Sequence, residues 1–197
     1  MKLGLQTLTF LLTLPSALTL ATRRFPVNVT TNATITPPSS VNLTTNGTIA
    51  PPSRYYLQTR VKGYGNEDKN GLYVSGYHTG AGENDVTLES IDAASVGFLN
   101  GTNQQFDYGT DFPWGMVMVL YDYYAEWDFV AINAGYGSAG FFFNETGLQY
   151  NQNPDGFSGW LVCDWWHGVP QLFWKFFDNS NQFPSSCAQV DLLPVAV

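Results

Sequence analysis

A strict alternation of side chains with a period of two residues runs through the stretch Tyr55-Tyr56-Leu57-Gln58-Thr59-Arg60-Val61-Lys62. Tyr55, Leu57 and Val61 fall on one side of this stretch, whereas Arg60 and Lys62 fall on the other. Successive side chains of a β-strand point to opposite faces, so the pattern predicts a strand with one buried face.

Eleven further strand-like runs follow, at residues 72–77, 85–88, 96–99, 105–108, 116–124, 128–133, 140–143, 148–150, 159–165, 171–177 and 188–193. Turn signals separate them: Asn100-Gly101 is typical of a tight hairpin, and residues 144–147 and 154–156 are turn clusters. Many short strands with glycine-rich turns predict an all-β domain, either a compact antiparallel sandwich or a closed barrel, with a trefoil-like barrel as the alternative. We assign residues 55–197 to this single domain.

The N-terminal segment has the features of a secretory signal peptide. Met1-Lys2 is a basic head, residues 3–20 are largely apolar, and Thr19-Leu20-Ala21 is a plausible cleavage site. We therefore predict that residues 1–21 are a leader and that the protein is secreted. Arg23-Arg24 is either a dibasic processing site or a pair of solvated charges.

Residues 22–54 predict a disordered, glycosylated stalk. A 14-residue unit at 27–40 is repeated almost unchanged at 41–54, and both copies are rich in Thr, Asn, Pro and Ser. Such a composition cannot bury enough apolar surface to become ordered. N-glycosylation sequons occur at Asn28, Asn32, Asn42, Asn46, Asn100 and Asn144, and the last two lie on predicted turns.

The two cysteines, Cys163 and Cys187, are 24 positions apart in a chain predicted to enter an oxidising compartment. We therefore expect a disulfide between them rather than a metal site. The chain has 16 acidic and 8 basic residues and a net charge of -8, which argues against nucleic acid and anionic lipid as partners. After the leader, no apolar run approaches the length of a membrane span.

Four tryptophans, one aspartate and one histidine crowd into residues 159–174. A hairpin whose inner face belongs to the core explains most of this composition. The alternative is an aromatic platform on which a sugar stacks, with the candidate residues Tyr123, Trp127, Trp165 and Trp166.

No catalytic or metal site is evident around His78 and His167. His167 has Asp164 nearby in the sequence, but there is no nucleophile elbow and no paired histidine spacing. We expect no metal and no cofactor. Carboxylates lie among aromatic residues near position 125, as a glycoside hydrolase requires, although a solvated acidic face is the simpler interpretation.

Three motifs carry a resemblance to a known family: Tyr77-His78-Thr79-Gly80-Ala81-Gly82, Gly97-Phe98-Leu99-Asn100-Gly101-Thr102 and Trp160-Leu161-Val162-Cys163-Asp164-Trp165-Trp166-His167-Gly168-Val169-Pro170-Gln171-Leu172-Phe173-Trp174. The chain resembles an uncharacterised family of small secreted proteins from filamentous ascomycete fungi over about residues 55–193. The resemblance implies a leader followed by one all-β domain at the cell wall or outside the cell. It implies no catalytic residue.

The sequence therefore predicts a non-enzymatic binding or structural module of a fungal cell wall or host surface. Its expected partners are glycans or an extracellular protein. The alternative is a small glycoside-active enzyme that uses carboxylates among Asp122, Glu126, Asp128 and Asp164.

Overall fold

A computed structural model describes residues 47–120, 126–152, 156–176 and 183–197. Within them the chain forms twelve strands: β1 (Tyr55–Val61), β2 (Tyr73–Gly80), β3 (Glu83–Glu89), β4 (Gly97–Asn100), β5 (Asn103–Phe106), β6 (Trp114–Met118), β7 (Trp127–Ala134), β8 (Phe141–Asn144), β9 (Gly147–Tyr150), β10 (Gly159–Asp164), β11 (Pro170–Lys175) and β12 (Cys187–Ala196). Two short 3-10 helices, η1 (Glu67–Lys69) and η2 (Ile91–Ala93), follow β1 and β3. Each predicted strand run overlaps one of these strands, and the predicted all-β class is confirmed.

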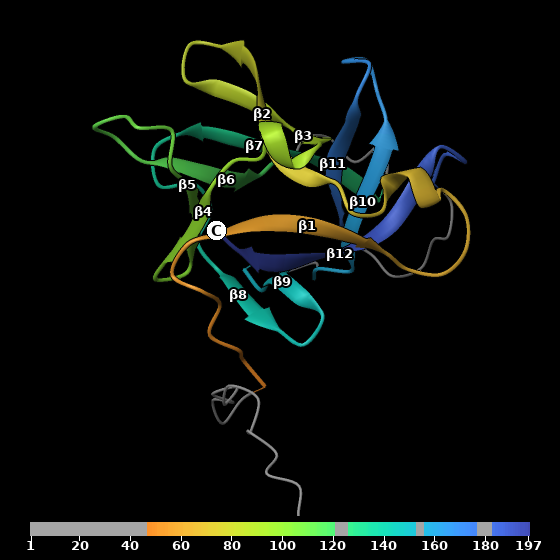
Figure 1. The fold of residues 1–197 in the computed structure, drawn as a ribbon, viewed down its shortest axis with the longest axis horizontal. Helices are drawn as coiled ribbons and strands as arrows, with labels where there is room; N and C mark the ends of the chain where they lie inside the picture. The colour runs from red at the N-terminus through yellow and green to blue at the C-terminus, as the bar shows by residue number, and fades with distance from the viewer. Residues whose placement is uncertain (1–46, 121–125, 153–155, 177–182) are drawn as a thin grey trace, which may run out of the picture. The chain divides into compact units, whose positions relative to one another are not determined.

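The strands close into an antiparallel barrel (Figure 1). Its nine-strand ring runs β1, β12, β10, β11, β3, β7, β6, β5, β4 and returns to β1 through the pairing of Tyr55 with Gly97. Strand β2 pairs along β3 and touches β1 at one position. The closed barrel is therefore the architecture that this chain adopts among the predicted alternatives.

The barrel interior is filled by the inward face of each strand. In β1, Tyr55 and Leu57 are fully buried and Thr59 nearly so, as the alternation in the sequence predicts. The Tyr55 hydroxyl donates a hydrogen bond of 2.7 Å to the buried Gln104 Oε1. The large side chains of Trp160 on β10 and Trp174 on β11 belong to the same core cluster.

Strands β10 and β11 bury both of their faces. Trp160 and Val162 point into the barrel, while Leu161 and Cys163 belong to a second apolar cluster on the outer side with Phe173 and Cys187. Cys163 and Cys187 are direct neighbours across β10 and β12 and form a disulfide, which confirms the predicted pairing. Trp127 and Phe129 of β7 pack against this outer cluster.

The predicted turns at 100–101 and 144–147 lie where the sequence places them, whereas most of the turn cluster predicted at 154–156 lies outside the described residues. Asn100 pairs with Asn103 around Gly101, whose φ of 61° is in the left-handed region. The β8–β9 hairpin packs against β12, and Gly147 follows its turn. A Cβ on Gly147 would lie 2.1 Å from the Leu192 carbonyl oxygen, so the close approach requires glycine.

The predicted leader and most of the predicted stalk, with Asn28, Asn32, Asn42 and Asn46, lie outside the described residues. The described part begins at residue 47, and the Ile49 amide donates a hydrogen bond to the Phe143 carbonyl oxygen at 2.8 Å. The described chain contains no helix long and apolar enough to cross a membrane.

We expect the buried tyrosines to lower the free energy of unfolding at alkaline pH. Burial raises the pKa of Tyr55, and burial also raises the pKa of Tyr108. A tyrosine that ionises in the unfolded chain near pH 10 but stays protonated in the fold stabilises the unfolded state as pH rises further. We expect Tyr55 alone to lower the free energy of unfolding by about 1 kcal/mol between about pH 8 and about pH 10.5.

Urea unfolding at the two pH values measures this loss. Tyr55→Phe should reduce the difference between them, whereas Tyr64→Phe, at a fully exposed position, should leave it unchanged. Equal pH dependence in the Tyr55→Phe variant and the unmodified protein would contradict the expectation.

Candidate aromatic pocket

The floor of the candidate site is the outer face of β3, β7 and β11. Phe173 on β11 pairs with Phe129 on β7, and Gln171 pairs with Thr87 on β3. Because side chains alternate along a strand, Leu172 points into the core while its two neighbours, Gln171 and Phe173, point outward. The floor is therefore apolar at Phe173 and polar at Gln171.

The turn between β10 and β11 carries two tryptophans to this face. The ring of Trp165 packs edge-on against Phe173, with centroids 5.2 Å apart, and against Trp127, with centroids 5.9 Å apart. Trp127 and Phe173 are themselves 5.0 Å apart. These three rings form a mutual edge-to-face cluster, an arrangement that aromatic quadrupoles favour.

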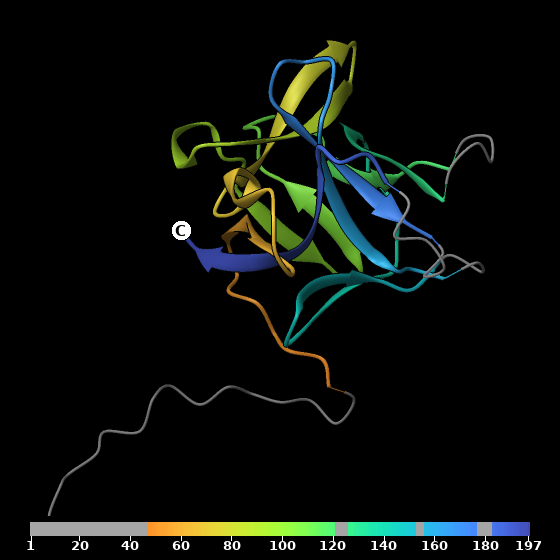
Figure 2. The same cartoon turned by 90° about the vertical axis from the view of Figure 1, so that its right-hand side faces the viewer.

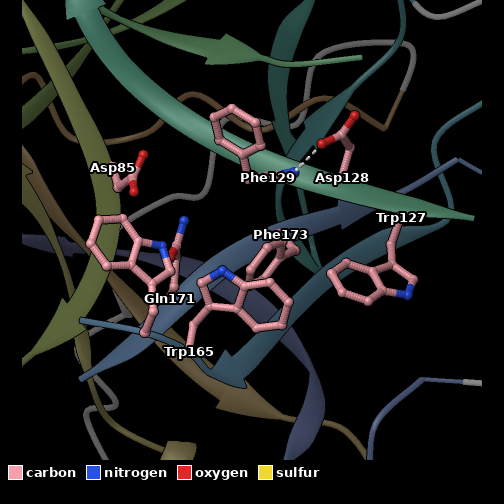
Figure 3. Close-up of a pocket in the computed structure, with 8 residues that line it drawn as sticks. Asp85, Trp127, Asp128, Phe129, Trp165, Gln171 and Phe173 are labelled. Carbon is pink, nitrogen blue, oxygen red and sulfur yellow. Dashed lines mark hydrogen bonds between the residues drawn. The ribbon is translucent and has the colours of Figure 1, made fainter. Parts of the chain in front are cut away.

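Together these elements enclose a cavity of about 350 Å³, lined by Asp85, Trp127, Asp128, Phe129, Trp165, Trp166, Gln171 and Phe173. Figure 3 shows Asp85 and Gln171 on one side of Trp165, and Trp127 and Asp128 on the other. Trp165 remains 43% exposed and Trp166 71% exposed, so large aromatic faces are open to a ligand. A concave, mainly apolar pocket with a few polar groups is the usual form of a small-ligand site.

Asp85 is held in place by a histidine that lies far from it in the sequence. His167 Nε2 lies 2.6 Å from Asp85 Oδ2, and the His167 side chain is fully buried. The imidazole ring stacks between Tyr77, at a centroid distance of 4.1 Å, and Trp166, at 3.7 Å. Figure 2 shows the β2–β3 hairpin and the β10–β11 turn at the same end of the barrel.

Two buried polar atoms near the pocket have no hydrogen-bond partner in the described structure. One is Oε1 of Gln171, a residue that is 2% exposed, and the other is Nδ1 of His167. A buried acceptor without a partner is costly, so such atoms are often satisfied by a ligand or a water molecule.

Most residues of the predicted aromatic platform line one cavity, whereas the predicted catalytic carboxylates among the described residues do not all lie there. Trp127, Trp165 and Trp166 all line the cavity, whereas Tyr123 lies outside the described residues. Of the proposed carboxylates, Asp128 lines the cavity; Glu126 and Asp164 do not, and Asp122 falls outside the described part.

Asp164 forms an ion pair with the buried Lys69 and does not pair with His167. Lys69 Nζ lies 2.6 Å from Asp164 Oδ1 and also contacts Asp68, and its side chain is 3% exposed. Burial alone would lower the pKa of Lys69, but the hydrogen bonds to Asp164 and Asp68 outweigh it and raise that pKa. The ion pair fixes η1 against the end of β10.

Sequence reasoning missed Asp85, Gln171 and the role of His167. Asp85 is 82 positions from His167, and no local spacing connects the two. The described residues hold no group of three or more side chains suited to a metal ion.

A larger cavity, of about 610 Å³, lies near the start of the domain beside Arg54, Asp107 and Phe112. Two of its charged residues, Arg54 and Asp107, pair with each other: Arg54 Nη2 is 2.6 Å from Asp107 Oδ2, and this hydrogen bond lowers the pKa of Asp107. The smaller cavity is the better candidate, since it combines clustered tryptophans with an unpartnered buried acceptor.

No curated protein and no solved structure matches this chain. One family model does match, a domain of unknown function (DUF7907), over residues 52–196. This match spans the whole barrel from before β1 to the end of β12, including the pocket and the disulfide. The chain therefore belongs to the DUF7907 family, whose function is unknown.

Proposed function

We propose that this protein is a secreted, non-enzymatic glycoprotein that binds carbohydrate through the aromatic pocket, at a cell wall or a host surface. The observation that carries the proposal is the convergence of Trp127, Trp165 and Trp166 on one cavity with Asp85 and Gln171. Aromatic rings offer apolar faces to the C–H side of a sugar ring, and carboxylate and amide groups accept hydrogen bonds from its hydroxyls.

The extracellular location rests on the sequence. A leader at residues 1–21 and a repeated Thr- and Asn-rich stalk precede the barrel. The disulfide agrees with an oxidising compartment. The fungal source rests on the motif resemblance alone.

Glycans on the barrel would stand clear of the pocket. Asn100 is exposed at the end of β4, and Asn144 is the last residue of β8, where its Oδ1 accepts hydrogen bonds from the Thr146 amide and hydroxyl. Neither residue lines the cavity. We propose that both are glycosylated, together with the four stalk sequons.

Retention on immobilised chitin, chitosan, β-glucan and mannan tests the proposal. We expect one polysaccharide to retain the protein, and Trp166→Ala to weaken binding at least about tenfold, because it removes the most exposed indole of the pocket. Tyr136→Ala is the matched control, since Tyr136 is 66% exposed and does not line the cavity.

Circular dichroism and thermal unfolding establish that each variant is folded. No retention on any polysaccharide, or equal retention of Trp166→Ala and the unmodified protein, would refute carbohydrate binding at this pocket.

A further inference from the structure

We infer that the sugar taken by the aromatic pocket carries a free, protonated amino group, so that its ligand class is an oligosaccharide of glucosamine rather than of a neutral sugar. This inference rests on the proposed carbohydrate function and specifies the ligand of the same site. Three features of the pocket carry it: the charge of its lining, an unpartnered acceptor and its open indole faces.

The lining is acidic and holds no basic side chain. Asp85 and Asp128 contribute carboxylates, and neither Lys nor Arg occurs among the described residues that line the cavity. The whole chain carries a net charge of -8, which adds a long-range attraction for cations. A neutral sugar would gain nothing from this field, whereas an ammonium group would.

Two hydrogen-bond acceptor oxygens without a donor among the described residues lie at one end of the pocket, one from Asp85 and one from Gln171. The hydrogen bond to His167 uses Oδ2 of Asp85, and Oδ1 receives no hydrogen bond from the described residues. Gln171 Oε1 is buried and unpartnered beside the same cavity, and Figure 3 shows Gln171 and Asp85 on the same side of Trp165. An ammonium group donates three hydrogen bonds, which suits two acceptors of this kind better than the mixed donor and acceptor character of a hydroxyl.

The position of Asp85 is fixed before any ligand binds. His167 is fully buried between the Tyr77 and Trp166 rings, so it cannot swing away without breaking both stacks. A carboxylate that is already oriented binds a cation without a further ordering cost.

The face of an indole ring binds cations in addition to apolar groups. Trp165 and Trp166 are both substantially exposed at the pocket, and tryptophan gives the strongest cation–π interaction of the aromatic residues. A protonated amino sugar can therefore place its C–H face and its ammonium group on the same aromatic wall.

The test compares two tetrasaccharides with the same sugar backbone, the tetramer of glucosamine, whose amino groups are charged, and the tetramer of N-acetylglucosamine, whose amino groups carry neutral acetyl groups. Binding to the full glycosylated protein is measured by calorimetry at a pH where the amine is protonated. We expect the glucosamine tetramer to bind at least about tenfold more tightly, and its affinity to fall as salt screens the charge.

Asp85→Asn removes the charge but keeps the shape of the side chain, and it should narrow the ratio between the two affinities to less than about threefold. Asp92→Asn makes the same charge change on η2, away from the cavity, and should preserve the ratio.

Three other binding results would contradict, in turn, the charge of the ligand, its assignment as a sugar, and the proposed function. Equal or tighter binding of the neutral tetramer overturns the charge inference but leaves carbohydrate binding intact. Tighter binding of tri-lysine than of the glucosamine tetramer overturns the sugar assignment in favour of a basic protein partner. Binding of neither tetramer, together with no retention on polysaccharides, refutes the proposed function itself.

Discussion

Trp160→Ala is expected to lower the free energy of unfolding by about 3–5 kcal/mol. Trp160 is 2% exposed, belongs to the barrel core and packs against Phe157 at a centroid distance of 4.8 Å. Its indole Nε1 also donates a hydrogen bond of 2.7 Å to the Leu148 carbonyl oxygen. The substitution would therefore leave both a large cavity and a buried acceptor without its partner, in the contact between the barrel wall and the β8–β9 hairpin.

Two further variants separate these effects in urea unfolding. Trp160→Phe keeps an aromatic ring but loses the hydrogen bond, so we expect a smaller loss of about 1–3 kcal/mol. Trp166→Ala removes the same side chain from an exposed position and should cost less than about 1 kcal/mol. If Trp160→Ala proved no more destabilising than Trp166→Ala, the assignment of Trp160 to the core would be wrong.

The strands of this fold are predictable because their signals are local. The alternation from Tyr55 to Lys62 predicts which face of β1 is buried, and Asn100-Gly101 predicts the position of the β4–β5 turn. Closure of the barrel is different, since it depends on pairings such as Tyr55 with Gly97, which join distant segments. Alternation specifies which face is buried but not which strand pairs with which, so the sequence left sandwich and barrel open.

In the candidate site, too, some residues could be predicted from local sequence signals, whereas others depend on contacts between distant segments. Its tryptophans could be selected from sequence because indoles beside strand ends are conspicuous, and Trp127, Trp165 and Trp166 indeed meet at one cavity. Its polar groups could not be selected in this way. Asp164 is the acidic residue nearest to His167 in the sequence, yet Lys69 binds it, and Asp85 reaches His167 only because β3 and β11 are neighbours in the barrel.

Removal of the disulfide is expected to impair both the fold and the pocket. Replacing Cys163 and Cys187 together with alanine should lower the free energy of unfolding by about 3 kcal/mol, because the unfolded chain is no longer restricted by the closed loop. Alanine is chosen because both positions are buried, where a serine hydroxyl would add its own cost.

The effect on binding follows from the location of the bond. The two cysteines belong to the outer cluster with Leu161 and Phe173, and the Phe173 ring contacts Trp127 and Trp165 in the pocket wall. Loss of the cross-link should loosen this support, so we expect the double variant to bind the retained polysaccharide several-fold more weakly at a temperature where it is still folded. Urea unfolding and polysaccharide binding of the same preparation measure the two effects. Unchanged binding in the destabilised variant would show that the strands alone hold the pocket, because the stability loss arises in the unfolded chain whereas the binding loss requires a change in the folded one.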